Sequence, residues 1–175
     1  MFKIKSIGLL FAAIMGTLIP LQAASMQDTQ MGFKTEVPDG WISIMPATTN
    51  VTRRNFLIPK IATVSVGVYH FDTVPTPGIV EKIQISEHYD GWITLFRREL
   101  NTNELRRANA DMGEIIAYGL NRLNPNNTLS KKVVVEYYFT QNDNGYLVSI
   151  ETTESDWKIA EASFKAFIKT FMLIR

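Results

Sequence analysis

The chain has 175 residues, of which 46% are hydrophobic and 20% are charged, and its formal net charge is +1. It is too apolar to be a disordered segment, and it carries no excess of positive charge that would favour a nucleic acid as its partner. It contains no cysteine, which excludes disulfide bonds, thiolate metal sites, a cysteine nucleophile and a lipidated cysteine.

Residues 1–24 have the features of a secretory signal peptide. Lys3 and Lys5 precede an apolar run over residues 7–19, Pro20 ends that run, and small residues at 23–25 offer three alternative cleavage positions. The run is shorter than the roughly 20 residues that a membrane-spanning helix needs. We therefore expect an exported protein, periplasmic or secreted, with no stable membrane span after cleavage. Loss of the two lysines changes the net charge from +1 to −1, and residues 25–175 are expected to form a single domain.

The first half of this domain is rich in strand patterns. Residues 32–37 alternate apolar and polar side chains, residues 38–40 (Pro-Asp-Gly) form a turn, and residues 41–45 are again extended. This order predicts a hairpin. Residues 53–58 fit either a short strand or a helical turn. Residues 61–71 are apolar on both faces, which predicts a central strand.

The second half contains two predicted helices on either side of three strands. The first helix would begin at Ser86 and place Tyr89, Trp92, Ile93, Phe96 and Leu100 on one face. Residues 101–111 fit a loop or an extension of that helix. The last helix would be capped by Ser155 and would bury Trp157, Ala160, Phe164, Phe167, Ile168 and Phe171.

Residues 114–123, 133–140 and 146–153 are predicted to be antiparallel strands. Asn144–Gly145 is the expected turn between the last two, because this dipeptide tolerates positive φ angles. The order of elements predicts an α+β fold, in which helices pack on a mainly antiparallel sheet.

The segment Gly32-Phe33-Lys34-Thr35-Glu36-Val37-Pro38-Asp39-Gly40-Trp41 resembles the opening of the PsbP-like α/β/α sandwich family. The late hairpin, followed by a C-terminal helix with an aromatic stripe, is similar to that family too. The family includes an extrinsic photosystem II subunit, Ran-binding nuclear-import factors and uncharacterised bacterial exported proteins. The resemblance implies an α/β/α sandwich and a role in binding or assembly; it transfers no metal-binding or Ran-binding residue to this chain.

Catalytic and metal-binding patterns are weak. His70 and His88 lie in different predicted elements, and there is no His-x-x-x-His motif, calcium loop, Gly-x-Ser-x-Gly elbow or glycine-rich phosphate loop. Glu136 and Glu151 are expected on the same face of the last hairpin, with Asp143 opposite Tyr146, where a solvated surface is a simpler interpretation than an acid–base pair. We expect no catalytic residue, no metal and no cofactor.

Three arginine doublets are the most suggestive pattern: Arg53-Arg54, Arg97-Arg98 and Arg106-Arg107. Arginines brought together could hold an anionic ligand, a lipid head group or an acidic partner surface, although acidic residues are interspersed. Trp41 could lie at the rim of a cleft or in the core. The candidate contact residues are therefore Trp41, Arg53, Arg54 and Arg97.

The sequence leads to three functional hypotheses. The first is a non-enzymatic binding or assembly protein, whose partner is another envelope or secreted protein. The second is a carrier of a small apolar or anionic ligand in a cleft between helix and sheet, lined by Trp41 and an arginine. The third is an unrecognised hydrolase, which would need a Ser-His-Asp cluster, with His70 or His88, in a concave pocket of the folded chain.

Overall fold

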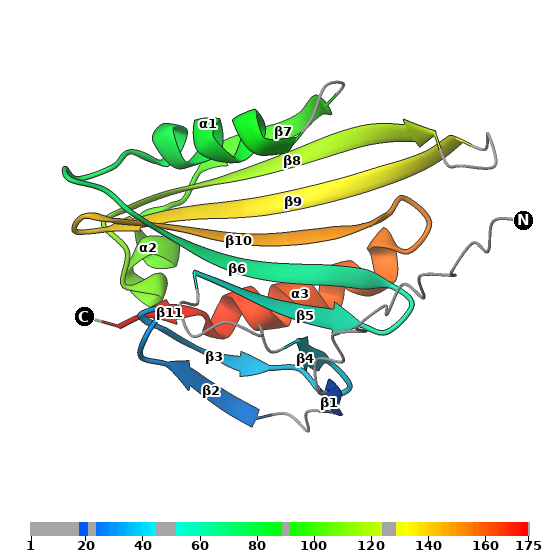
Figure 1. The fold of residues 1–175 in the computed structure, drawn as a ribbon, viewed down its shortest axis with the longest axis horizontal. Coiled ribbons are helices and arrows are strands. Elements are labelled where there is room, and N and C mark those ends of the chain that lie inside the picture. Colours follow the sequence, from blue (N-terminus) through cyan, green and yellow to red (C-terminus); the bar gives the residue numbers. More distant parts are fainter. Residues whose placement is uncertain (1–17, 21–23, 45–51, 89–91, 124–128, 175) are drawn as a thin grey trace, which may run out of the picture.

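Two antiparallel sheets and three helices make up the part of the chain that the computed structural model describes, residues 18–20, 24–44, 52–88, 92–123 and 129–174. The large sheet has the strand order β1-β4-β5-β6-β10-β9-β8-β7, and the small one β11-β3-β2 (Figure 1). The strands of the large sheet are β1 Leu18–Pro20, β4 Ile42–Ile44, β5 Arg53–Ile58, β6 Ala62–His70, β7 Trp92–Glu99, β8 Met112–Leu123, β9 Leu129–Gln141 and β10 Asn144–Thr153. The small sheet contains β2 Ala24–Asp28, β3 Phe33–Val37 and β11 Met172–Leu173.

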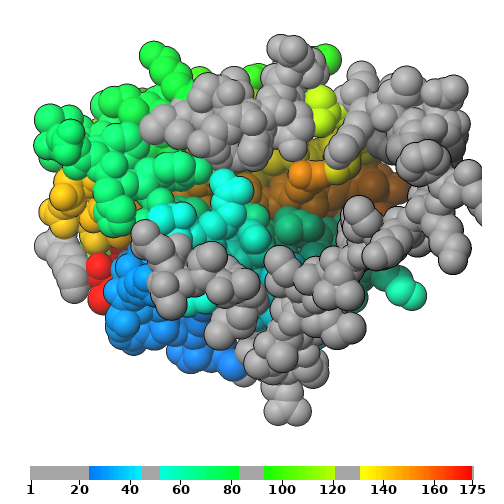
Figure 2. Space-filling model, in the orientation of Figure 1, coloured from blue at the N-terminus to red at the C-terminus, as the bar shows by residue number. Residues whose placement is uncertain are grey.

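The helices lie on opposite faces of the large sheet (Figure 1). Helix α1 (Pro77–His88) covers one face, and α3 (Trp157–Thr170) covers the other together with the small sheet; the short α2 (Thr102–Ala108) contacts α3 and β11. In Figure 2 the green atoms of the segment that leads into α1 lie over one end of the first face, and orange-brown atoms of β10 stay visible beside them. The predicted α+β architecture, a mainly antiparallel sheet with helices packed on it, is confirmed.

Alternation along β9 shows how the two faces differ. Val135 and Phe139 project into the main core, where aromatic side chains of α3 and of the small sheet meet them. Phe171 stacks on Phe33 at a ring separation of 5.4 Å and on Phe139 at 5.5 Å. The opposite face holds a smaller cluster, formed by Val80 of α1 with Ile116, Tyr118, Val134, Tyr138 and Leu147 of the sheet.

The predicted hairpin over residues 32–45 is wrong in its pairing. Residues 38–40 do form a turn, in which Gly40 takes a φ of 78°. However, β3 pairs with β2 and β11, whereas β4 pairs with β1 and β5, so the turn carries the chain from one sheet to the other. The alternation correctly predicted buried positions for Phe33, Thr35 and Val37.

The predicted helix over residues 86–100 is also wrong. The helix of this region is α1, which begins at Pro77 and ends at His88, and residues 92–99 form strand β7 along β8. Proline lacks an N–H and has a helical φ, so it suits the first position of a helix. Residues 53–58 are a strand, and residues 101–111 contain α2, which begins with a capping box between Asn101 and Glu104.

The last hairpin has a different register from the predicted one. The turn lies at Asn142–Asp143, where Asn142 has a φ of 53°, and Gln141 pairs with Asn144. Gly145 is part of β10, where a Cβ would lie 2.5 Å from Val80 Cγ2 of α1. The glycine is therefore needed for the close approach of helix and sheet rather than for the turn. At α3, Asp156 holds the N-cap position without a side-chain capping bond, so Ser155 is not the cap.

Of the predicted signal segment, the structure describes residues 18–20 and Ala24, and cleavage stays a prediction. Residues 18–20 form β1, which pairs with β4. Within the described residues, no helix has both the length and the apolar character that crossing a membrane requires.

Candidate functional site

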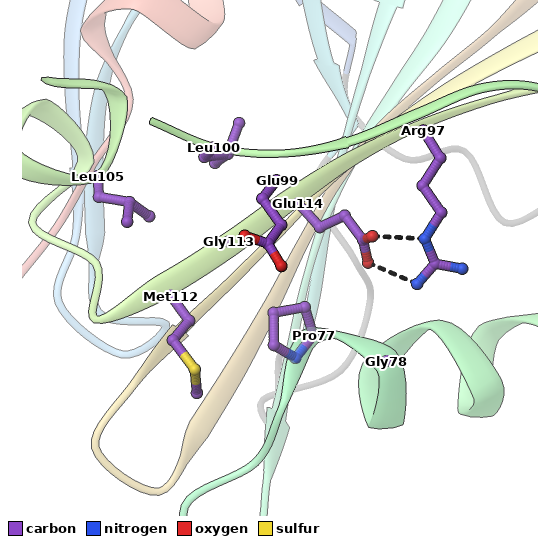
Figure 3. Close-up of a pocket in the computed structure, with 9 residues that line it drawn as sticks. All are labelled: Pro77, Gly78, Arg97, Glu99, Leu100, Leu105, Met112, Gly113 and Glu114. Atoms are coloured by element: carbon purple, nitrogen blue, oxygen red, sulfur yellow. Dashed lines mark hydrogen bonds and ion pairs between the residues drawn. The ribbon is translucent and has the colours of Figure 1, made fainter. Parts of the chain in front are cut away.

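A cavity of about 340 Å³ lies where the start of α1 meets the ends of β7 and β8 that are next to α2 (Figure 3). This volume falls within the roughly 300–1,000 Å³ of typical ligand sites. The lining residues are Pro77 and Gly78 of α1, Arg97 and Glu99 of β7, Met112, Gly113 and Glu114 of β8, and Leu100 and Leu105.

Arg97 is the cation of this cavity, and it is already paired. Its Nε donates to Oε1 of Glu114 at 2.5 Å, and its Nη2 donates to Oε2 at 2.8 Å. Nη2 also lies 3.0 Å from Oε2 of Glu81 on α1. The hydrogen bond with Glu114 raises the pKa of the Arg97 guanidinium. A two-point guanidinium–carboxylate contact of this kind is among the stronger polar interactions in proteins.

Glu99 gives the cavity its excess of negative charge. It lies directly opposite Glu114 across the β7–β8 ladder, where two carboxylates repel each other. Arg97 neutralises Glu114, and the Glu99 carboxylate points into the cavity (Figure 3). The lining residues thus carry two carboxylates and one guanidinium, so an anionic ligand would be repelled.

The remaining wall is apolar and closely fitted. Leu100 is buried, and Leu105 and Met112 complete this side of the cavity. A Cβ on Gly113 would lie 2.6 Å from Leu100 Cδ1 and 2.9 Å from the backbone oxygen of Tyr138. Glycine at this position therefore lets β8 pass beneath Leu100.

Strand β7, which contributes Arg97 and Glu99, lies at one edge of the large sheet. Its described side chains, residues 93–99, are all exposed. Ile93 and Leu95 are 60% and 61% exposed, and Phe96 is 47% exposed. A long, apolar edge strand with unpaired backbone groups favours pairing with another chain.

A buried polar network lies behind the cavity, between α1 and the sheet. Tyr138 donates a hydrogen bond to Glu136, which is only 1% exposed. Tyr118 donates to Oε1 of Glu81 at 3.3 Å. Burial is the main cause that raises the pKa of both tyrosines. A solvated location for Glu136 was therefore wrong, whereas Glu151 is partly exposed and pairs with Lys132.

Trp41 lies in the main core and is 1% exposed. Its ring stacks on Phe167 at 5.1 Å, and its Nε1 donates to Oγ of Ser163 at 2.7 Å. The structure therefore places Trp41 away from the cavity, on the other side of the large sheet.

The candidate arginines Arg53, Arg54 and Arg97 do not converge on one site. Arg53 and Arg54 point to opposite faces of β5, and Nε of Arg54 lies 2.5 Å from Oδ2 of Asp28. Arg97 and Arg98 likewise alternate on β7, and Arg98 bonds both oxygens of Glu104 at 2.7 Å. Five strand spacings of about 4.8 Å separate β5 from β7, or roughly 24 Å. Arg53 and Arg97 are therefore not part of one site.

His70 does not form the cluster that a hydrolase would need. Its Nδ1 lies 2.5 Å from Oδ1 of Asn144, its neighbour across the β6–β10 ladder. The side chain of His88 lies outside the described part of the structure. Among the described residues, no group of three or more histidine, aspartate or glutamate side chains is placed to hold a metal ion.

Sequence reasoning missed Glu99, Glu114 and the apolar edge of β7. Ile93 and Phe96 were assigned to the buried face of a helix, because apolar spacing was taken as a sign of burial. The sequence feature that could have located the site is the run of apolar residues directly before Arg97-Arg98-Glu99. Such a run is also compatible with an exposed edge strand.

No protein-family model matches this sequence, and no curated protein matches it. Solved structures show that it has a PsbP/Mog1-like fold. The solution structure of the cyanobacterial PsbP protein from Synechocystis superposes with a TM-score of 0.58 at 14% identity, over 95% of this chain and 98% of that one. The crystal structure of the Saccharomyces cerevisiae Ran-binding protein Mog1p superposes with a TM-score of 0.57 at 10% identity, over 86% of this chain and 95% of that one. A Pseudomonas aeruginosa protein of unknown function superposes with a TM-score of 0.50 at 14% identity, over 85% of this chain and 90% of that one. These likenesses establish the fold alone.

Proposed function

We propose that this chain is an exported, non-enzymatic binding or assembly protein, and that its protein partner docks on the edge of β7. The single observation that carries the proposal is the exposure of Ile93, Leu95 and Phe96 on a strand that, within the described residues, has a neighbouring strand on one side only. Apolar anchors at such an edge favour association, because the backbone supplies affinity and the side chains supply selectivity.

Two further observations support this proposal. The described polar clusters consist of paired or hydrogen-bonded groups, such as Arg97 with Glu114, and do not resemble a nucleophile with its base. One protein of the same fold, Mog1p, is a Ran-binding protein by its name. Export to the periplasm or the exterior rests on the signal-like residues 1–24.

Site-specific photo-crosslinking in the native host tests the β7 interface. A photoreactive phenylalanine analogue replaces Leu95 on β7 in one variant and Ile159 on α3 in a control variant, since these side chains are similarly exposed at 61% and 63%. We expect one protein to be crosslinked at position 95 and not at position 159. Equal crosslinking at both positions, or none at position 95, would contradict the proposal.

Substitution provides an independent measurement. Leu95→Lys should reduce the capture of that crosslinked protein by about tenfold or more, because loss of an apolar anchor costs on the order of 1.4 kcal/mol or more. Ile159→Lys should leave capture unchanged. Cell fractionation and N-terminal sequencing of the mature chain test export, with cleavage expected after residue 23, 24 or 25.

A small-ligand carrier is the second candidate function, because the cavity beside Arg97 lies between α1 and the sheet. Its excess of carboxylates favours an apolar or cationic ligand over an anionic one. Native mass spectrometry of protein purified from its own compartment would reveal a bound small molecule of matching stoichiometry, and a mass equal to that of the bare chain would contradict this alternative.

A further inference from the structure

We propose that the partner of β7 adds an extended strand to its free edge and inserts one basic side chain, lysine or arginine, into the cavity beside Glu99. The inference rests on the proposed function, and it identifies the chemistry of the docking segment.

The backbone of β7 is arranged to accept such a strand. Leu100 N–H donates to the Gly113 carbonyl oxygen at 2.9 Å. Backbone groups alternate in direction along an antiparallel pair, so Arg98, which is opposite Ile115, also faces β8. The backbone groups of Arg97 and Glu99 consequently point toward the outer edge of β7, where the Glu99 carbonyl oxygen accepts a hydrogen bond from Nη1 of the exposed Arg98 side chain at 3.0 Å that an added strand would replace. Among the described strands, none pairs with β7 on that side.

The side chains of an added strand would follow the same alternation. A residue placed directly opposite Glu99 projects from the same face of the sheet, with its Cβ about 4.5–5.5 Å from that of Glu99. This is the face on which Glu99, Glu114 and the start of α1 enclose the cavity. The partner's side chain at this position therefore lies at the cavity.

The charges of the cavity identify that side chain. Arg97 is held by Glu114 and Glu81, and Glu99 adds a second carboxylate to the lining. A lysine or arginine would bring the missing positive charge, and its aliphatic stem could lie along Leu105 and Met112 while its charged end approaches Glu99. A volume of about 340 Å³ corresponds to roughly eleven water molecules, which is ample for one long side chain.

The rest of β7 predicts the neighbouring positions of the partner segment. In antiparallel pairing, the residue three positions after the basic one lies opposite Phe96 and projects from the same face of the sheet as Phe96. Phe96 is exposed and apolar, so an apolar residue is expected there. The predicted docking segment is thus basic at one position and apolar three residues later.

Synthetic heptapeptides provide the test, with the full mature chain as their target. The first has the sequence Thr-Lys-Thr-Thr-Val-Thr-Thr, blocked at both ends and labelled for fluorescence anisotropy. Its matched controls replace lysine by norleucine or by glutamate, and a fourth peptide keeps the lysine but carries N-methyl groups on alternate backbone nitrogens. The protein variants are Glu99→Gln and, as a control, Glu154→Gln, which removes an exposed carboxylate on another part of the surface.

We expect the lysine peptide to bind the wild-type chain at least about tenfold more tightly than the norleucine peptide, and the glutamate peptide to bind most weakly. Glu99→Gln should abolish the preference for lysine, and Glu154→Gln should keep it. N-methylation should remove binding, because it removes the strand's hydrogen bonds. Equal affinity of lysine and norleucine peptides, a preference that survives Glu99→Gln, binding of the N-methylated peptide, or no binding of any peptide would each overturn the inference.

These outcomes can be distinguished from failure of the proposed function. If the partner still crosslinks at position 95 while the peptides show no preference for lysine, β7 is the interface and the basic-strand inference is wrong. If crosslinking at position 95 fails, the proposed interface itself is wrong.

Discussion

Arg97 pairs with Glu114 diagonally across the β7–β8 ladder, not with a residue directly opposite. Directly opposite Glu114 is Glu99, and Arg97 faces Ile116. The diagonal contact satisfies both oxygens of Glu114, which is 8% exposed. It leaves Glu99 as the carboxylate that determines the charge of the cavity.

Removal of this guanidinium should destabilise the chain. Arg97→Met keeps much of the apolar stem but leaves a buried Glu114 beside Glu99, and we expect a loss of about 1–2 kcal/mol in the free energy of unfolding at pH 7. Urea denaturation measures it. The loss should be smaller in the background of Glu114→Gln, since that residue carries no charge to neutralise. Equal losses in the two backgrounds would show that the ion pair does not contribute.

The buried tyrosines should make the fold sensitive to alkali. Burial raises the pKa of Tyr118 and Tyr138 above the ordinary value of 10.0, and the same cause raises the pKa of Tyr137 and Tyr146. Above about pH 10 the unfolded chain loses tyrosine protons that the folded chain keeps. Stability is therefore fully present below pH 10 and is lost as the pH rises.

Denaturant unfolding between pH 8 and pH 11 tests this expectation, with ultraviolet absorbance to follow tyrosinate. Tyr138→Phe should reduce the alkaline slope and should also cost about 1–3 kcal/mol at pH 7, because Glu136 loses a buried hydrogen bond. A stability that stays constant up to pH 11 would contradict the assignment of buried, protonated tyrosines.

Two glycines near α1 offer a matched pair of substitutions. Gly145→Ala would place a Cβ 2.5 Å from Val80 Cγ2 and 3.0 Å from Phe71 Cε2, whereas Gly78→Ala meets nothing within 4 Å. We expect Gly145→Ala to cost about 1–3 kcal/mol through overpacking. Gly78→Ala should be neutral or slightly stabilising, because alanine is the better helix former. Thermal unfolding measures both, and Val80→Ala should partly rescue Gly145→Ala if the helix contact is the cause.

The start of α2 should respond to acid. Hydrogen bonds from Arg98, and the backbone bond from Asn101 N–H, hold the pKa of Glu104 below its ordinary value of 4.5. The ionised Glu104 carboxylate therefore stabilises the folded chain fully above about pH 4.5, and this stabilisation is lost as the pH falls through the lower pKa of the folded state. Glu104→Gln should therefore flatten the stability profile between about pH 5 and pH 3.

A surface pair provides the control for Glu104. Glu161 and Lys165 are 2.8 Å apart on the outside of α3, and such exposed pairs contribute only about 0.3–0.5 kcal/mol. Glu161→Gln should thus leave the acid profile nearly unchanged. If the two variants behaved alike, the capping box of α2 would have no special role.

Much of the fold was predictable, because buried and exposed side chains alternate regularly in its central strands. The buried positions of β3 and the stripe of α3 follow directly from a period of two and a period of about 3.6 residues. Strand β7 could not be predicted in the same way, since Ile93, Leu95 and Phe96 are apolar and exposed. Apolar periodicity indicates secondary structure only where burial selects the apolar residues.

The candidate site was predictable in only one residue, Arg97. The sequence shows that Arg97 is charged, but it does not show that Glu114, from a strand that follows α2, accepts hydrogen bonds from both Nε and Nη2 of the guanidinium. Gly145 shows the same limit. The sequence predicts a turn at Gly145, but this glycine lies in a strand that packs closely against α1, and the turn lies at Asn142 instead. Contacts between distant segments decided both cases.

The small sheet brings together segments from early and late in the sequence. Its central strand β3 has β2 on one side and the two-residue β11 on the other, and Thr35 Oγ1 meets Thr170 Oγ1 at 3.1 Å. Until residues 172–173 have been synthesised, one edge of β3 therefore lacks its strand neighbour. The small sheet can be completed only after every other described strand has been made.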